Sequence, residues 1–325
     1  MARLFDRGRE KAKVLTGQAT EWVEDRRDDD GLVEVATRLY ERDRDAFGTV
    51  LGSALALRLF LFVVPADIAL FSLINVVDLD RWASPLTESP TTGEVATQVF
   101  ATNWTRSLWI FLSMAVFTLW AGRSLARVLA TCSASSWQLP ARQAKLKLKG
   151  VAAVSGLFVA LLLASMLIGR LRQVGGFTVT ASSWVLVALV MGAGWFLLTM
   201  TLPRRTTDPG ALLPGVILVA VGFAGLSWFM HIYLPDKIER MSDTYGSLAV
   251  SVATLGYFFS VGRLLASAFT LNAVAFERFG GVSHYVFSVP GVRAVPTRWP
   301  AVARYFDLDG TQRARALDDQ ESVPA

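Results

Sequence analysis

The chain has 325 residues, of which 53% are hydrophobic and only 18% are charged, and its mean hydropathy is +0.41. Soluble domains carry about 25% charged residues, so this composition excludes an ordinary soluble surface unless the charges lie outside long apolar runs. They do lie outside such runs, because charge-free stretches cover residues 150–169, 173–203, 209–235 and 244–262. About 20 apolar residues cross a hydrocarbon core. The composition therefore excludes a secreted, fibrous or disordered protein and predicts a polytopic helical membrane protein.

Charge and residue counts narrow the class further. The net charge of +5 is what loop lysines and arginines give when they set membrane topology, so we expect no nucleic-acid partner. Cys132 is the only cysteine, which excludes an intrachain disulfide and a cysteine metal cluster, and His231 and His284 are too few for most histidine metal sites. We therefore expect neither a metal nor a cofactor. The first 49 residues lack the apolar stretch of a cleaved signal peptide.

The amino-terminal region divides into a tail and a helix. Residues 1–30 are polar and end in an acidic run, which is typical of a cytoplasmic tail. Between residues 32 and 47, apolar side chains recur with the spacing of one helix face, namely Leu32, Val35, Ala36, Leu39 and Tyr40. Arg38, Arg42 and Arg44 lie on or near the other side. The pattern predicts an amphipathic helix at the cytoplasmic interface, and a helical extension of the first span explains it almost as well.

Six membrane spans follow in chain order. Backbone groups in lipid must be paired within the segment, so we expect each span to be a helix and the fold to be all-α. The expected spans are residues 50–77, 107–130, 150–168, 183–202, 212–233 and 246–274. Together they form a transmembrane domain over residues 31–280, and residues 281–325 form a second cytoplasmic tail.

Basic residues in the connections give the orientation. Eight of them belong to the second and fourth connections and the adjoining span end: Arg123, Arg127, Arg142, Lys145, Lys147, Lys149, Arg204 and Arg205. Six belong to the alternate connections: Arg81, Arg106, Arg170, Arg172, Lys237 and Arg240. Both tails are also basic close to the membrane. We therefore expect both termini in the cytoplasm, with residues 78–106 as the largest external loop.

Ionisable residues inside the spans are the best candidates for a functional role, because burying a charge in lipid is costly. At 1.5 Å per residue, Arg58, Arg123 and Arg263 lie about 10–16 Å from the cytoplasmic ends of the first, second and sixth spans. Arg127 lies one turn below Arg123 on the same face. The arginine fork suits phosphate or carboxylate. One interpretation is a cytoplasm-facing basic cavity in which these four arginines bind an anionic head group.

A structural interpretation of the same residues competes with the cavity. Arg123 and Arg127 would extend to the interface, and Arg263 would pair with Asp67 across helices. Asp67 lies nine residues after Arg58 and so faces away from it, which leaves Asp67 to find another partner or a proton. Pro65 is expected to kink the first span. Asp67 and Pro65 are therefore candidates for coupling or gating.

Two further patterns bear on partners and chemistry. Gly256 with Ser260, and Gly262 with Ala266, have the small-xxx-small spacing that permits close helix contact, either within one chain or between two copies in a homo-oligomer. The signatures of nucleotide-binding loops, zinc proteases and serine hydrolases are missing from the sequence, so we expect no enzymatic activity.

The last two spans resemble the YihY/BrkB family of bacterial inner-membrane proteins, once labelled ribonuclease BN. The resemblance lies in Leu202-Pro203, in Leu213-Pro214-Gly215 at the start of the fifth span, in Tyr245-Gly246-Ser247-Leu248 and in Leu271-Asn272-Ala273. The first span also fits, with Ala54-Leu55-Ala56 and Phe62 to Pro65, and the similarity covers roughly residues 32–280. Two positions depart from the family pattern. Tyr257-Phe258-Phe259 replaces the usual Trp-x-Tyr, and Thr270 stands where a glutamate is common.

The resemblance implies six helices with both ends in the cytoplasm of a bacterium, and work in the cell envelope. The leading hypothesis is therefore an inner-membrane transporter or flippase-like carrier of an anionic amphiphile or envelope lipid, with membrane lipids as its partners. The rival hypothesis is a non-transporting envelope-integrity scaffold that acts through protein partners.

Overall fold

The computed structural model describes residues 32–77, 93–140, 156–157, 177–232, 247–281, 283, 287, 298–308, 310–312 and 314. All regular secondary structure in these ranges is helical, which confirms the all-α prediction for this part of the chain. The long helices are α2 (Leu32–Asp45), α3 (Gly48–Val76), α6 (Trp104–Ser136), α8 (Phe177–Thr201), α9 (Leu213–Ile232) and α11 (Ser247–Phe279). The short ones are α5 (Gly93–Phe100), the 3₁₀ turn η2 (Pro209–Leu212) and α14 (Pro300–Tyr305).

Four helical segments in the described residues are long and apolar enough to cross a membrane: Gly48–Val76, Trp104–Ser136, Pro209–Phe229 and Val252–Phe279. They coincide with the first, second, fifth and sixth predicted spans. The fourth predicted span coincides with the second part of α8, which contains the apolar segment Val185–Thr201. The third, residues 150–168, lies outside the described residues except for 156–157.

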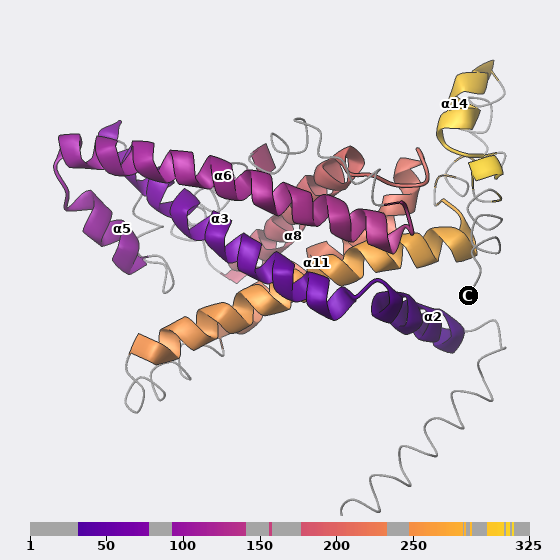
Figure 1. Cartoon of the computed structure of the whole chain (residues 1–325), viewed down its shortest axis with the longest axis horizontal. Helices are drawn as coiled ribbons and strands as arrows, with labels where there is room; N and C mark the ends of the chain where they lie inside the picture. Colours follow the sequence, from indigo (N-terminus) through magenta and orange to yellow (C-terminus); the bar gives the residue numbers. More distant parts are fainter. Residues whose placement is uncertain are drawn as a thin grey trace, which may run out of the picture.

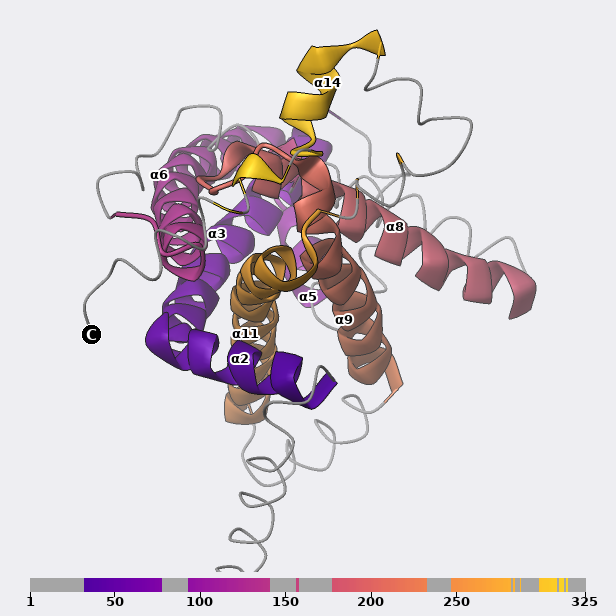
Figure 2. The ribbon, with the colours of Figure 1, turned by 90° about the vertical axis from the view of Figure 1, so that its right-hand side faces the viewer.

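The bundle is built around α11. Helices α3 and α6 run side by side in opposite directions, and α11 crosses α3 near the start of α3 (Figure 1). On its other side α11 packs against α9, which in turn contacts α8 (Figure 2). A single buried cluster joins these five helices through residues such as Leu55, Leu125, Trp195, Val219 and Phe269. The sole cysteine, Cys132, belongs to this cluster and is 1% exposed.

The outer faces of the helices remain apolar. On α6 they carry exposed Trp109, Val116, Leu119 and Trp120, and on α11 exposed Val252, Leu255 and Phe259. Soluble monomers rarely expose apolar surface of this extent. Lipid chains can cover such faces without cost, because the chains are as apolar as the side chains that they contact.

The chain bends between α2 and α3. Phe47 adopts the left-handed conformation, with φ 53°, so α2 is a separate helix and not a straight extension of the first span. A helix is therefore present over Leu32–Asp45, separate from α3. Within its predicted apolar face, Val35 and Leu39 are half-buried, whereas Ala36 and Tyr40 are exposed. The buried side of α2 is charged instead, because Glu34, Arg42 and Asp43 face α11.

The opposite end of the bundle is closed by a polar contact. The Asn75 amide near the end of α3 donates to the carbonyls of Val99 and Thr102 and to the Ser107 hydroxyl at 2.7 Å. Trp104 donates from its indole nitrogen to the Val76 carbonyl at 3.2 Å. These bonds fix α5 and the start of α6 against α3 at the end predicted to face outward.

Candidate functional site

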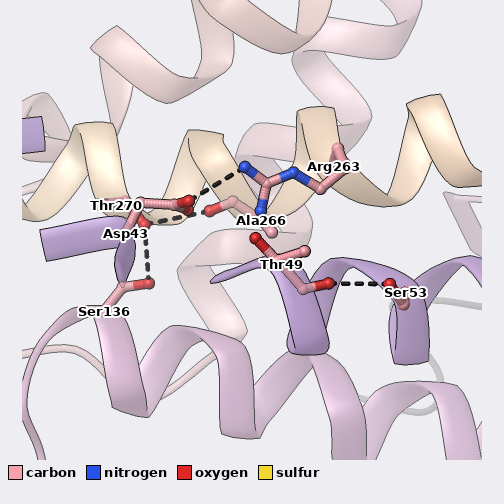
Figure 3. Close-up of polar contacts among 7 residues, drawn as sticks. All are labelled: Asp43, Thr49, Ser53, Ser136, Arg263, Ala266 and Thr270. Atoms are coloured by element: carbon pink, nitrogen blue, oxygen red, sulfur yellow. Dashed lines mark hydrogen bonds and ion pairs between the residues drawn. The ribbon is translucent and has the colours of Figure 1, made fainter. Parts of the chain in front are cut away.

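The most unusual polar contact of the bundle joins α2 to the middle of α11. The guanidinium Nη2 of Arg263 lies 3.0 Å from Asp43 Oδ2, at the point where α2, α3 and α11 meet (Figure 3). Both side chains are mostly buried, with 30% of Arg263 and 19% of Asp43 exposed. The ion pair accounts for the intramembrane arginine of the sixth span. The alternative prediction, in which Arg263 pairs with Asp67, is therefore wrong.

Two glycines of α3 make room for this ion pair. A Cβ atom on Gly52 would lie 2.8 Å from Cδ of Arg263, and one on Gly48 would lie 2.0 Å from Oδ1 of Asp43. The two glycines are one helical turn apart and so lie on one face of α3. The ion pair consequently rests on bare helix backbone, and any larger residue at either glycine would displace it.

The same crossing brings two backbones together. A Cβ atom on Gly262 would lie 2.4 Å from the carbonyl oxygen of Gly52 and 2.8 Å from the backbone nitrogen of Ala56. The Gly262–Ala266 pair therefore packs within one chain, as the small-residue spacing permits. Gly256 behaves differently, because a Cβ atom there would meet nothing within 4 Å, and its predicted companion Ser260 is exposed.

Two more ion pairs hold α2 against the last turn of α11. Arg42 pairs with Glu277, and their side chains are only 11% and 15% exposed. Arg278 pairs with Glu34 at 3.0 Å, and Glu34 also binds Arg38 at 2.7 Å within α2. Burial lowers the pKa of the Arg42 guanidinium, and the Glu277 carboxylate opposes that shift. The signs alternate along both helices, so the pairs fix which residues of α2 and α11 face each other.

The structure staggers the predicted intramembrane arginines. Arg263 lies beside Gly52 of α3, whereas Arg58 lies six residues further along α3, a rise of about 9 Å. Arg58 is half-buried. Arg123 and Arg127 are both on the exposed side of α6. Among the described residues, no hydrogen bond or ion pair connects any two of these four arginines.

Asp67 and Pro65 lie further along α3. Pro65 is buried, and α3 continues through it from Gly48 to Val76 as one helix. Asp67 is half-buried and forms no hydrogen bond or ion pair with the residues that the structure describes. Its position, nine residues beyond Arg58, corresponds to about 14 Å of rise and places it deep inside the span.

The family motif residues gather where α9 begins. The side-chain oxygen of Asn272 accepts a hydrogen bond from the backbone nitrogen of Gly215 at 2.6 Å, and both residues are buried. Pro214 directly precedes Gly215 in the first turn of α9. The carbonyl of Pro203 accepts a bond from the Ser133 hydroxyl of α6 at 2.7 Å. Tyr245 and Gly246 lie outside the described residues.

Sequence reasoning missed one buried acid, Asp208, which precedes η2. Its Oδ1 accepts hydrogen bonds from the Gly210 nitrogen at 2.8 Å and from the Ser283 hydroxyl at 2.5 Å, and the residue is 0% exposed. Burial raises the pKa of the Asp208 carboxyl, and the bonds from Ser283 and Gly210 act against that shift. The sequence Asp208-Pro209-Gly210 is a recognisable signal, since an aspartate before a proline commonly caps a helix.

The carboxy-terminal segment docks beside this loop. The Thr207 hydroxyl donates to the Tyr305 carbonyl at 2.8 Å, and the Thr207 nitrogen donates to the Gln312 side chain at 2.9 Å. The loop between α8 and α9 thus connects α6, α11 and α14. In the described part of the chain, no group of three or more acidic, histidine or cysteine side chains could hold a metal ion.

Comparison with protein families supports the resemblance noted in the sequence. The model of the family described as virulence factor BrkB matches residues 39–284, which is more than half of the chain. Comparison with curated proteins and with solved structures gave no significant match. The matched range begins within α2 and ends just after α11, so it includes Asp43, Arg263, Gly215 and Asn272. The chain is therefore a member of the BrkB virulence factor family.

Proposed function

We propose that this protein is a six-span inner-membrane carrier that moves or accommodates an anionic amphiphile, such as an envelope lipid, with both termini in the cytoplasm. The proposal involves no enzymatic step and no cofactor. In this topology α2 lies at the cytoplasmic interface as an amphipathic helix, with Ala36 and Tyr40 toward lipid. The third and fourth predicted spans complete the bundle.

One observation carries the proposal: two helices present an exposed apolar face that leads to arginine. On α6 the face with Trp109, Val116 and Trp120 leads to Arg123 and Arg127. On α11 the face with Val252, Leu255 and Phe259 leads to Arg263. An amphiphile with an anionic head and apolar chains has the complementary pattern, because arginine binds phosphate or carboxylate and the apolar face accepts the chains.

The length of the charge-free part of α6 supports this assignment. Arg106 and Arg123 are separated by 17 residues, or about 26 Å of helix, which is close to the ~30 Å hydrocarbon thickness. The two arginines therefore suit the two head-group levels of a bilayer, with Arg123 and Arg127 on the cytoplasmic side. Asp67 lies between these levels on α3, and we propose it as the residue whose protonation couples or gates movement, assisted by the Pro65 region.

Transport in proteoliposomes tests the proposal. Wild type is compared with Arg123→Ala/Arg127→Ala and with Arg58→Ala, using a fluorescent anionic lipid whose exposure is followed by a membrane-impermeant quencher. We expect slower redistribution in these variants. Arg298→Ala is the control, since it removes an exposed arginine that lies outside the bundle helices. Wild-type redistribution in folded Arg123→Ala/Arg127→Ala protein would contradict the proposal.

The docked carboxy-terminal segment favours the second candidate function, an envelope-integrity scaffold. Tyr305 and Gln312 contact Thr207 on a loop that reaches three helices. A scaffold of this kind would use its tails to bind partners. Truncation after residue 297 that abolishes complementation, with Arg58→Ala and Arg123→Ala still active, would favour the scaffold over the carrier.

A further inference from the structure

The ion pair between Arg263 and Asp43 is incomplete. Only Nη2 of Arg263 and Oδ2 of Asp43 are joined, at 3.0 Å. The second atom of each group, Nη1 of Arg263 and Oδ1 of Asp43, is buried and has no hydrogen-bond partner. Arginine and carboxylate commonly bind through two parallel bonds, and a buried charged atom without a partner is costly. Asp43 thus makes one of the two parallel bonds that a carboxylate can form with a guanidinium.

The Arg263 side chain is nevertheless partly accessible, although its Nη1 atom is buried. Its side chain is 30% exposed, and the α11 residues one to three turns nearer the outer end carry exposed side chains. These are Phe259, Leu255 and Val252, at 44%, 58% and 56% exposure. Gly256 lies between them and keeps the surface flat, because a Cβ atom there would meet nothing within 4 Å. An apolar track thus leads along α11 to the guanidinium.

The track has the length of one lipid leaflet. Val252 and Arg263 are 11 residues apart, which is about 17 Å of helix. Half of a hydrocarbon core of ~30 Å is about 15 Å. A lipid with its head group at Arg263 would therefore lay its acyl chain over Phe259, Leu255 and Val252.

We propose that Arg263 is a binding site for the phosphate or carboxylate head group of a cytoplasmic-leaflet lipid, and that Asp43 is a tethered competitor which occupies the site until the head group replaces it. This inference deepens the proposed carrier function and rests on it for its biological purpose. Once the Asp43 side chain leaves, Nη1 and Nη2 can both donate to a phosphate, which then gives the buried Nη1 the partner that Asp43 does not provide.

The exchange requires little movement of the protein. Arg42–Glu277 and Glu34–Arg278 hold α2 against α11 independently of Asp43. The Asp43 side chain must leave the guanidinium, and it is 19% exposed at the end of α2, next to the bend at Phe47. A zwitterionic lipid such as phosphatidylcholine binds Arg263 less favourably, because its own cation competes with Arg263 for the phosphate. Asp43 thereby selects for net anionic head groups.

Lipid binding to purified full-length protein tests the site. Native mass spectrometry measures apparent Kd for phosphatidylglycerol and phosphatidylcholine in wild type, Asp43→Asn and Arg263→Ala. If Asp43 occupies the site nine-tenths of the time, removing its charge tightens phosphatidylglycerol binding about tenfold. Phosphatidylcholine binding should change little, and Arg263→Ala should lose the selectivity for phosphatidylglycerol.

Glu34→Gln is the matched control, since it breaks an ion pair of α2 at the other end of the helix without touching Arg263. We expect it to leave the phosphatidylglycerol affinity unchanged. An equal gain in Glu34→Gln and Asp43→Asn would show general loosening of α2 and would overturn the proposal. Wild-type affinity in Asp43→Asn would also overturn it. If Arg263→Ala does not fold, the comparison of Asp43→Asn with Glu34→Gln decides alone.

Two further arms separate ligand source from function. Inorganic phosphate is added to the Asp43→Asn protein with bound phosphatidylglycerol. Displacement of the lipid shows that the head group alone fills the site, and no displacement shows that the acyl track is also required. Either result supports a site at Arg263 only if Arg263→Lys weakens phosphatidylglycerol binding. If a lipid head group replaces Asp43 at Arg263 but no lipid redistribution occurs in proteoliposomes, the carrier function is contradicted and the binding site stands. Redistribution that proceeds without binding exchange removes the site and keeps the carrier.

Discussion

Asn272 of α11 caps the first turn of α9 by accepting a hydrogen bond from the backbone nitrogen of Gly215 at 2.6 Å. The first turn of a helix has backbone donors without partners in the helix itself, and here one of them is buried. A Cβ atom on Gly215 would lie 2.5 Å from the carbonyl oxygen of Ala268 and 2.6 Å from Oδ1 of Asn272. The bond therefore depends on an amide at one position and a glycine at the other.

Replacing Asn272 should destabilise the bundle. Asn272→Ala leaves the buried Gly215 nitrogen without an acceptor, at a cost of about 1–3 kcal/mol. Asn272→Asp keeps an acceptor but buries a charge and should fall between the two. Thermal unfolding in detergent measures the order, with wild type most stable and the alanine variant least stable. If Asn272→Ala unfolds at the same temperature as the wild type, the bond contributes nothing to stability.

Two glycines of α11 should respond in opposite ways to alanine. Gly262→Ala forces a Cβ atom to 2.4 Å from the Gly52 carbonyl and should separate α3 from α11. Gly256→Ala places its methyl group in open space and should stabilise the helix by up to about 1 kcal/mol, because alanine is the better helix former. Detergent thermal-shift measurements on both variants test the contrast. Equal behaviour of the two would mean that the close crossing is not tight in solution.

The Arg42–Glu277 pair should show strong coupling in a double-mutant cycle. Because both side chains are largely buried, Glu277→Ala leaves a desolvated guanidinium and should cost about 3 kcal/mol. Arg42→Met/Glu277→Leu removes both charges and should recover much of that loss. Unfolding at low and high salt distinguishes this pair from a surface pair, since a buried pair is weakly screened. Additive single effects would contradict the coupling.

Asp208 should make stability fall as pH rises. Its pKa is raised in the folded protein, so the fold binds the proton more tightly than the unfolded chain does. Stability from this group is complete below the unfolded pKa and declines as pH climbs through it toward the folded value. Asp208→Asn keeps the acceptor for Gly210 and should lack this decline. As pH rises from 4 to 8, the melting temperature of the wild type should therefore fall relative to that of Asp208→Asn. Parallel curves of melting temperature against pH would refute the raised pKa.

Hydropathy located the first, second, fifth and sixth spans, because the cost of leaving backbone groups unpaired in lipid dictates helix over each long apolar run. The predicted ends of the second and sixth spans, 130 and 274, precede the observed ends at Ser136 and Phe279. The part of α11 beyond residue 274 contains Glu277 and Arg278. Because these residues are charged, the hydropathy pattern ended before the helix does. Their partners on α2 explain why the helix continues.

The pairing of Arg263 was beyond the sequence. Its partner Asp43 lies 220 residues away and sits on a helix whose periodicity emphasised the apolar face. Depth counted from span ends also misled, because α11 crosses α3 at Gly52 and thereby brings Arg263 to the α2–α3 bend instead of to Asp67. Close crossings depend on which glycines meet, and small-residue spacing alone does not distinguish Gly262, which packs, from Gly256, which is open.

Cys132 gives the molecule a built-in reporter. Since it is the sole cysteine of the chain and is 1% exposed within the cluster that joins five helices, a thiol reagent can reach it only when that cluster opens. The rate of its alkylation therefore measures breathing of the bundle in unmodified protein. A ligand that loosens or tightens the packing of the helices would change the alkylation rate of Cys132, and no added label is needed to detect it.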